Sequence, residues 1–350
     1  MTGRAASRLP LIDAVKAVAS QLIVLHHLAF YGPMSDHARV LCPELIDWLS
    51  QHARIAVQAF LVVGGYLAAR ALARDENAAA RPVGKRLWRR YLKLALPYAA
   101  VLLLAVAAAA VSRRLIAHDS IPGAPTLLQF AAHVALLQNL LGFDSLSAGV
   151  WYIAIDFQLY AVLLLILRSA RHFRPERPEF GRGCVVALIA ASLYVFNRNP
   201  AWDDWAIYFF GAYGLGAVAR WGTRPGRIDG WAAATAAVAA AALIVDYRPR
   251  ILVALLTAAG LGLAHYGGVI AAWPESRLLA WLGRISYSVF LVHFPVCLVV
   301  NAVFERFAPH APAIQLGGMF LAWIASLACG ALLHRAVERR AAAWLARRET

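Results

Sequence analysis

Apolar segments long enough to cross a lipid bilayer recur along almost the whole of this 350-residue chain. Inside a membrane the backbone must satisfy its own hydrogen bonds, so segments of this kind restrict the fold to a bundle of helices. Hydrophobic residues make up 61% of the chain and charged residues 15%, which leaves no room for a soluble domain of ordinary size. We therefore predict an all-α, polytopic membrane bundle with ten spans, over residues 10–31, 53–73, 91–112, 148–167, 183–197, 203–220, 230–246, 250–272, 279–302 and 313–335.

One further apolar stretch, Leu127–Phe143, is interrupted by glutamine, histidine and asparagine. We expect this stretch to lie at the outer surface or to re-enter the bundle, without forming a full span.

Lysine and arginine are distributed unevenly between the two sides of the predicted bundle. With the N-terminus in the cytoplasm, 25 of the 34 basic residues fall on cytoplasmic segments and 8 on outer segments, while Lys16 lies within a span. Short loops rich in these residues stay on the cytoplasmic side. The net charge of +15 therefore reflects topology and does not indicate a nucleic-acid partner. We expect both termini in the cytoplasm and the bundle in the lipid of a bacterial inner membrane.

The sequence shows no spacing typical of a metal site or a phosphate-binding loop. Its four cysteines, at positions 42, 184, 297 and 329, follow no disulfide or metal-ligand pattern, and we expect reduced thiols. HExxH and glycine-rich phosphate-loop motifs are absent. We therefore expect no bound metal and no permanently bound cofactor.

The first apolar segment, Leu9–Tyr31, carries ionisable residues where a membrane helix should have none. Asp13, Lys16, Ser20 and His27 lie within roughly 60° of one line on a helix with about 100° per residue. Charges inside a membrane commonly cost about 2.5–3.5 kcal/mol each and usually mark a site or a pathway. Alternatively, Asp13 and Lys16 neutralise each other as an i,i+3 pair, which leaves His27 unexplained. We interpret Asp13, Lys16 and His27 as catalytic candidates.

The two adjacent histidines of this segment face different directions. His27 lies eleven residues after Lys16, so both face the same way, about 16 Å apart along the helix axis. His26 points about 100° away, where it is expected to reach interfacial water or a backbone carbonyl. We therefore assign a function to His27 alone.

A basic run, Lys85–Lys93, precedes the third predicted span. Within it Arg86, Arg89, Arg90 and Lys93 recur at helical spacing and form one cationic face. Such residues orient a span in the membrane, but several forked donors also suit phosphate groups. Topology and phosphate binding both remain open on these grounds.

Asp156 lies inside the predicted span over residues 148–167. A carboxylate in lipid needs a cationic or hydrogen-bonding partner. Tyr160, one turn later, could donate to it, while Lys16 and His27 are the natural partners from the first span. We predict that Asp156 approaches this first-span stripe.

Two further segments have a structural and a functional interpretation. Gly64 and Gly65 permit close helix packing or local unwinding beside a cavity, and we expect packing. In residues 283–296, GRISYSVFLVHFPV, Pro295 frees a backbone carbonyl within its helix. His293 either satisfies such a group or touches substrate.

These motifs, in this order, resemble the acyltransferase 3 family of integral-membrane acyltransferases. The resemblance rests on IDAVKAVASQLIVLHH, FLVVGGYL, RRYLKLALPY, VWYIAIDFQLY and LGRISYSVFLVHFPV, and it runs from Leu9 to about Val337. It implies one acyltransferase domain over residues 1–350, with a cytoplasmic tail after about residue 337 and no appended soluble domain.

The resemblance also places the family's functional residues on this chain. Its basic residue and histidine of the first span fall on Lys16 and His27, and its acidic residue on Asp156. Its arginines before the third-span proline fall on Arg90 and Lys93. Lysine replaces arginine at two of these positions, and aspartate replaces glutamate at one. Gly64 replaces a frequent serine, and a phenylalanine at position 157 replaces a second acid, which puts a two-carboxylate site in doubt.

The implied reaction transfers an acyl group, often acetyl, from cytoplasmic acyl-CoA to a hydroxyl of a glycan or lipid-linked acceptor. His27 would act as general base or carry the acyl group itself, and Asp156 would hold its imidazole. Lys16 and the basic face would bind the donor's phosphates or stabilise negative charge.

Two other classes remain possible from the residues alone. Intramembrane Asp, Lys and His would suit the proton relay of a proton-coupled transporter, although the chain shows no inverted repeat. A structural polytopic subunit would have no need of the charged stripe.

Overall fold

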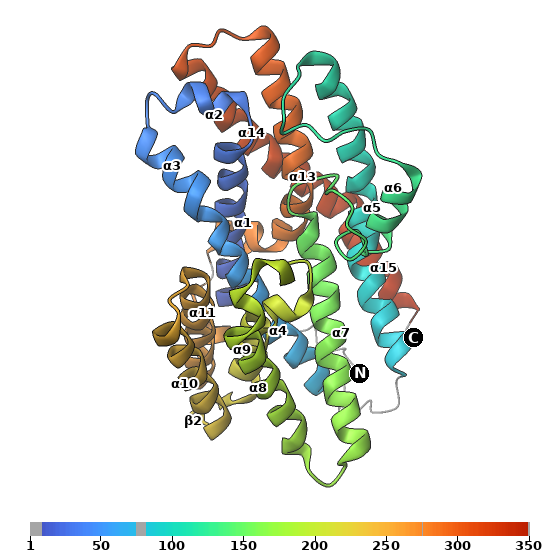
Figure 1. The fold of residues 1–350 in the computed structure, drawn as a ribbon, viewed down its shortest axis with the longest axis vertical. Helices are drawn as coiled ribbons and strands as arrows, with labels where there is room; N and C mark the ends of the chain where they lie inside the picture. The colour runs from blue at the N-terminus through green and yellow to red at the C-terminus, as the bar shows by residue number, and fades with distance from the viewer. Residues whose placement is uncertain (1–8, 75–81, 275, 349–350) are drawn as a thin grey trace. The chain divides into compact units, whose positions relative to one another are not determined.

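The computed structural model describes residues 9–74, 82–274 and 276–348, and this part of the chain is almost entirely helical (Figure 1). Its one sheet among these residues is a short hairpin of β1 (Thr223–Arg224) and β2 (Arg227–Ile228). The prediction of an all-α membrane bundle is therefore confirmed. The middle of the basic loop before the third span, residues 75–81, lies outside the described residues.

Eight helical stretches among the described residues are long and apolar enough to cross a membrane. Several of their helices begin with proline, whose fixed φ and missing N–H suit the first turn. The helices that form these stretches are α1 (Pro10–Phe30), α4 (Val57–Arg74), α5 (Val83–Leu115), α7 (Val150–Phe173), α8 (Pro178–Tyr194), α11 (Pro249–Tyr266), α13 (Arg277–Phe307) and α14 (Pro312–Leu333).

Two of the ten predicted spans form shorter helices. α9 (Ala206–Trp221) and α10 (Gly230–Val245) each contain 16 residues, fewer than the roughly 20 that a membrane helix needs. The count of ten spans therefore stays a prediction. Leu127–Phe143 contains the 8-residue helix α6 (Leu127–Val134) followed by turns, which confirms that it is no full-length helical span.

Shorter elements connect these helices. They are α2 (Pro33–Ala38), α3 (Pro43–His52), η1 (Ala53–Ala56), η3 (Phe196–Arg198), η4 (Pro200–Trp202), α12 (Val269–Ala272), the π-helix η5 (His334–Glu338) and α15 (Arg339–Arg347).

The chain forms two compact units, each assembled from separate stretches of sequence. The first unit comprises Met1–Ala17, Val57–Leu87 and Ile155–Gly283, and the second Val18–Ala56, Trp88–Ala154 and Arg284–Thr350. Four helices, α1, α5, α7 and α13, begin in one unit and end in the other. Both units lie within the single domain predicted for residues 1–350.

Helices α4 and α9 of the first unit touch through their backbones. A Cβ atom on Gly65 would lie 1.8 Å from the carbonyl oxygen of Tyr213, and one on Gly216 would lie 1.9 Å from the carbonyl oxygen of Val62. Only glycine permits so close an approach, as in the small-residue interfaces of membrane helices. The packing role predicted for the glycine pair at 64 and 65 is confirmed at Gly65.

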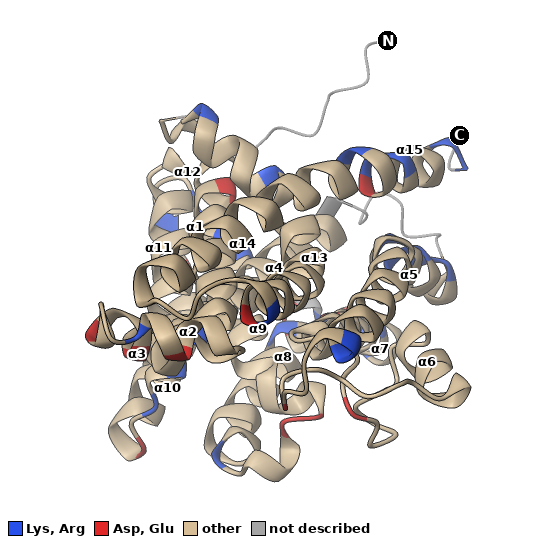
Figure 2. Ribbon diagram, turned by 90° about the horizontal axis from the view of Figure 1, so that it is seen from above, with Lys and Arg blue, Asp and Glu red and all other residues tan. Residues whose placement is uncertain are grey.

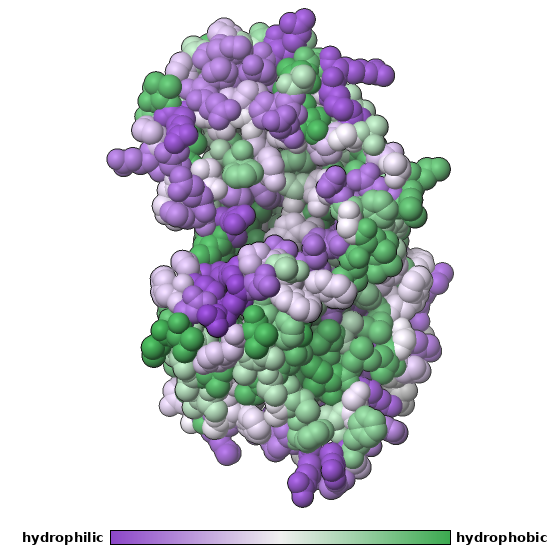
Figure 3. Space-filling model, in the orientation of Figure 1, coloured by the Kyte–Doolittle hydropathy of each residue, from purple (hydrophilic) through white to green (hydrophobic). Residues whose placement is uncertain are grey.

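Apolar side chains cover much of the molecular surface as well as its interior. Figure 3 shows them over the region where Figure 1 draws α7 and α8. Leu103, Leu165 and Leu256 expose 61%, 47% and 61% of their surface. A soluble protein would rarely present so many large apolar side chains, whereas lipid tails accept them. Basic residues are concentrated on α5 and α15 (Figure 2).

Candidate active site

The ionisable residues of α1 fall into two groups. In the first unit, Nζ of Lys16 lies 3.0 Å from Oδ1 of Asp13, and the two side chains are 25% and 16% exposed. The i,i+3 ion pair considered from the sequence is therefore formed. Each charge reduces the cost of placing the other in an apolar environment.

His27, in the last turn of the same helix, contacts a second histidine. In the second unit, Nδ1 of His27 lies 2.6 Å from Nε2 of His293 on α13, and both side chains are buried. Their rings are nearly parallel, with an interplanar angle of 5° and centroids 4.9 Å apart. The ring of Tyr31 lies 5.4 Å from that of His27 and packs edge to face on Phe294 at 5.2 Å, measured between centroids.

The hydrogen bonds around this pair assign the proton positions. Nδ1 of His293 lies 3.1 Å from the carbonyl oxygen of Val289, which can only accept, so this nitrogen carries a proton. In the neutral ring Nε2 of His293 then accepts from Nδ1–H of His27. The lone pair of His27 therefore lies on Nε2, the nitrogen that can receive a proton or an acyl group.

His26 has a different partner, as its direction on the helix predicted. Its Nδ1 lies 3.0 Å from the carbonyl oxygen of Leu49 in α3, and its ring stacks on Phe30. The carbonyl orients the ring of His26, which anchors α3 to α1. Proximity in the sequence to His27 therefore does not give His26 the same chemistry.

Asp156 lies on α7, buried in the first unit at the point where α4 carries its glycines. A Cβ atom on Gly64 would lie 3.3 Å from Oδ1 of Asp156 and 3.1 Å from the ring of Tyr213. Two residues later Oε1 of Gln158 accepts a hydrogen bond of 3.3 Å from the backbone N–H of Ala206, which ties α7 to α9. The approach of Asp156 to the first-span stripe remains a prediction.

Arginines from three predicted cytoplasmic segments line one cavity of about 360 Å³ in the first unit. Among the described residues, its lining includes one acid, Glu179, whose carboxylate lies 3.3 Å from Arg182. Asp229 lies 3.6 Å from the same arginine. Charges of one sign held around a cavity repel each other and attract an anion into it. The arginines are Arg86 of α5, Arg168 and Arg171 of α7, Arg177 and Arg182 near the start of α8, Arg220 of α9 and Arg224 of β1.

The predicted basic face of α5 contributes one of its four residues to this cavity. Arg86 lines it, whereas the described lining does not include Arg89, Arg90 or Lys93. Arg89 and Lys93 are exposed, and Arg90 is partly buried. Sequence reasoning thus found Arg86 but did not single out the other six arginines of the lining, whose only signal was the positive charge of short inner loops. The role of His293 also stayed open in the sequence analysis, because its contact with His27 joins residues far apart in the chain.

Comparison with protein families identifies the chain. A family model described as an acyltransferase domain, acyltransferase 3, matches residues 9–334. The chain belongs to the acyltransferase 3 family. The match covers nearly the whole length of this acyltransferase and includes every candidate site residue described above. Comparison of the acyltransferase with curated proteins and with solved structures found no match.

Proposed function

We propose that this membrane acyltransferase moves an acetyl group from cytoplasmic acyl-CoA to a hydroxyl of a glycan or lipid-linked acceptor. The observation that carries the proposal is the hydrogen-bonded pair of His27 and His293, because it leaves a basic nitrogen inside an apolar environment. Membership of an acyltransferase family supports transfer chemistry over a proton-coupled transporter or a structural subunit. We place the protein in a bacterial inner membrane, with both termini in the cytoplasm.

In this proposal His27 acts as the general base. Nε2 of His27 takes the proton of the acceptor hydroxyl while the oxygen attacks the thioester carbonyl. The carbon–sulfur bond then breaks, and the proton on His27 passes to the departing thiolate of CoA. In the alternative route Nε2 first accepts the acyl group and then passes it to the hydroxyl. Either route needs a lone pair on Nε2 of His27.

His293 is a positioning residue. It accepts the proton of Nδ1 of His27 and fixes the ring orientation, the part that a carboxylate plays in a catalytic triad. When His27 becomes protonated, the contact with Nε2 of His293 strengthens because its donor is then charged. This assigns to His293 the orienting part that sequence reasoning gave to Asp156.

The arginine-lined cavity supports a phosphate-rich donor such as acyl-CoA. Guanidinium groups form forked, charge-assisted hydrogen bonds with phosphate oxygens, and a topological role alone would not require arginines from separate segments to converge. Arg89, Arg90 and Lys93 lie one to two turns further along α5 and extend the same positive charge.

Ionisable residues of the first unit also suit this donor. Acyl-CoA carries its phosphates and its thioester at opposite ends of a flexible arm, so its phosphates need basic residues of their own. We assign Lys16, paired with Asp13, and the buried Asp156 to the positioning of donor and acceptor groups.

Acetyl transfer in isolated membranes tests the proposal. Membranes containing the full chain should move radiolabel from acetyl-CoA to an endogenous glycan or lipid-linked acceptor, and mild alkali should release it as acetate from an ester. Membranes with His27→Ala should show no transfer at equal protein level. Uptake of a substrate without covalent labelling, abolished by the same variant, would overturn acyl transfer and favour a transporter.

A further inference from the structure

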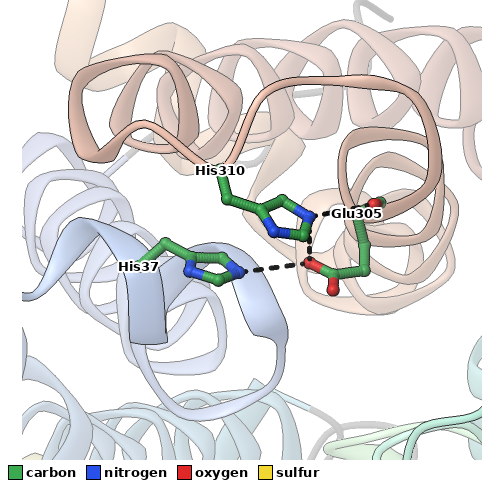
Figure 4. Close-up of side chains that lie close together, drawn as sticks. All are labelled: His37, Glu305 and His310. Carbon is green, nitrogen blue, oxygen red and sulfur yellow. Dashed lines mark hydrogen bonds and ion pairs between the residues drawn. The ribbon is translucent and has the colours of Figure 1, made fainter.

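His37 and a pair of residues far along the chain, Glu305 and His310, converge at one end of α13. His37 comes from α2, Glu305 from the last turns of α13, and His310 from the connection to α14. All three belong to the second unit, and Figure 4 shows both imidazoles directed at the glutamate carboxylate. Their candidate ligand atoms all lie within 4.8 Å of one another. The predicted topology places this end of α13 outside the membrane.

The distances fit a metal ion better than a set of hydrogen bonds. Oε2 of Glu305 lies 3.4 Å from Nε2 of His37 and 3.6 Å from Nε2 of His310. Good hydrogen bonds between nitrogen and oxygen are about 2.7–3.2 Å long. Two ligand atoms of a tetrahedral zinc ion, with bonds of about 2.0–2.2 Å, lie about 3.3–3.6 Å apart. The two nitrogen–oxygen distances are thus nearly those of a zinc coordination shell, and the two nitrogens lie within 4.8 Å of each other.

One oxygen of the Glu305 carboxylate, Oε2, has no hydrogen-bond donor among the described residues. This oxygen is shielded from solvent. The two imidazole rings stack on each other, with 4.5 Å between centroids and an interplanar angle of 17°, and both present Nε2 to this oxygen (Figure 4). One carboxylate oxygen and two imidazole nitrogens form a ligand set that zinc selects.

The segment that carries His37 is held on α13. One turn before the glutamate, Asn301 accepts a hydrogen bond of 3.3 Å from the backbone N–H of Met34 and donates one of 3.1 Å to the carbonyl oxygen of Tyr31. Gly32, at φ 142°, leaves room for this amide, since a Cβ atom there would lie 2.4 Å from Oδ1 of Asn301. The backbone of α2 is therefore fixed before any ion binds.

The connection that carries His310 is held as well. Gln315, buried at the start of α14, donates a hydrogen bond of 3.0 Å to the carbonyl oxygen of Pro309. Nε2 of His310 lies 3.2 Å from the backbone carbonyl oxygen of Glu305. A small rotation of the exposed His310 ring exchanges this contact for a metal bond. Preorganised ligands lose little entropy on binding, so such a site binds tightly.

We propose that His37, Glu305 and His310 bind one divalent zinc-type cation, with water at the fourth position. The ion would join α2 to the connection between α13 and α14, and would stabilise this end of the second unit. Spacing along the chain could not reveal the site, because no two of its ligands follow a recognised motif. The proposal stands apart from the acyl-transfer reaction and is tested by metal binding and stability.

The test uses the full chain purified in detergent, stripped with EDTA and then incubated with zinc chloride. After desalting, elemental analysis should find one zinc ion per chain, and thermal unfolding should shift upward in the presence of zinc. Cobalt chloride should give the visible absorption bands of a four-coordinate site. Glu305→Gln and His37→Ala should each weaken zinc binding at least about tenfold, since even losing an outer-shell partner costs 10- to 100-fold.

His52→Ala provides the matched control, because His52 is an exposed histidine of the same unit outside the cluster. It should bind zinc as the wild type does. Zinc retained equally by Glu305→Gln and wild type, or no zinc retained by the wild type, would overturn the site. Stabilisation at acid pH without any effect of zinc would show that the cluster is an ion pair of protonated histidines instead.

Discussion

The second unit contains two pairs of stacked histidines, which differ in burial and in the groups that their ring nitrogens contact. His27 and His293 are buried, and one imidazole donates directly to the other over 2.6 Å. His37 and His310 are 31% and 52% exposed, and both direct Nε2 at the Glu305 carboxylate. The first pair forms a chain of hydrogen bonds that leaves Nε2 of His27 as a base, whereas the second brings two ring nitrogens to one carboxylate oxygen. Burial and the third partner, not the histidine itself, decide between base and ligand.

The largest effect should follow from removing the base of the buried pair. His27→Ala should reduce acyl transfer by at least about 10³-fold, because a general base or acyl carrier contributes on this scale. His26→Ala should retain most activity, since its ring serves the Leu49 carbonyl. Initial rates of acyl transfer in membranes, normalised to the amount of folded protein, measure the activity of both variants. Equal losses in the two variants would refute the distinction between these neighbours.

Removing the orienting partner should cost less than removing the base. His293→Ala should lower kcat about 10- to 100-fold and leave KM for acyl-CoA nearly unchanged, because the ring of His27 loses its orientation but not its lone pair. His293→Gln can still accept from Nδ1 of His27 and should recover part of the rate. A rise in KM with unchanged kcat, or no rescue by glutamine, would count against a positioning role.

Substitution of an arginine that lines the cavity should change KM for acyl-CoA and leave kcat unchanged. Arg86→Ala should raise KM for acyl-CoA roughly 10- to 100-fold, since a charge-assisted hydrogen bond contributes about 1.5–3 kcal/mol. Lys85→Ala, an exposed neighbour outside the described lining, serves as control and should change KM less than about twofold. If KM for acyl-CoA is unchanged in a correctly inserted Arg86→Ala variant, the arginines of the cavity serve only to orient the spans in the membrane.

The exposed pair should contribute least to the reaction. His37→Ala should change the rate of acyl transfer by less than about twofold when measured in the presence of EDTA, because neither the base nor its partner is altered. The comparison is made at one temperature, below the unfolding transition of both proteins. A loss as large as that of His293→Ala would mean that the two pairs act in one site.

Sequence reasoning was strongest where a property repeats along the chain. Apolar length predicts helices because lipid leaves the backbone no alternative, and small residues predict the close crossing that Gly65 and Gly216 form. It was weaker for α9 and α10, where an apolar run predicted a span but the helix has 16 residues. Turn and cap positions shorten a helix without changing the composition of the segment.

The contacts that define the sites were less accessible. His27 and Glu305 each meet a histidine from another helix, and a helix face predicts only which residues point the same way. The ion pair of Asp13 and Lys16, considered from the sequence as an alternative, is formed because both residues lie on one turn. The arginine cavity has contributions from several segments, so the charge of each loop was visible while their convergence was not.

The contact between α4 and α9 also has a consequence for biosynthesis. The glycine surface of α4 is complete once Arg74 has been added, but its partner begins only at Ala206. At translation rates of about 5–20 residues per second, the gap amounts to something on the order of ten seconds. During this interval the surface at Gly65 lacks the carbonyl oxygen of Tyr213 that it contacts in the folded chain. This backbone contact of the first unit therefore forms late in the synthesis of the chain.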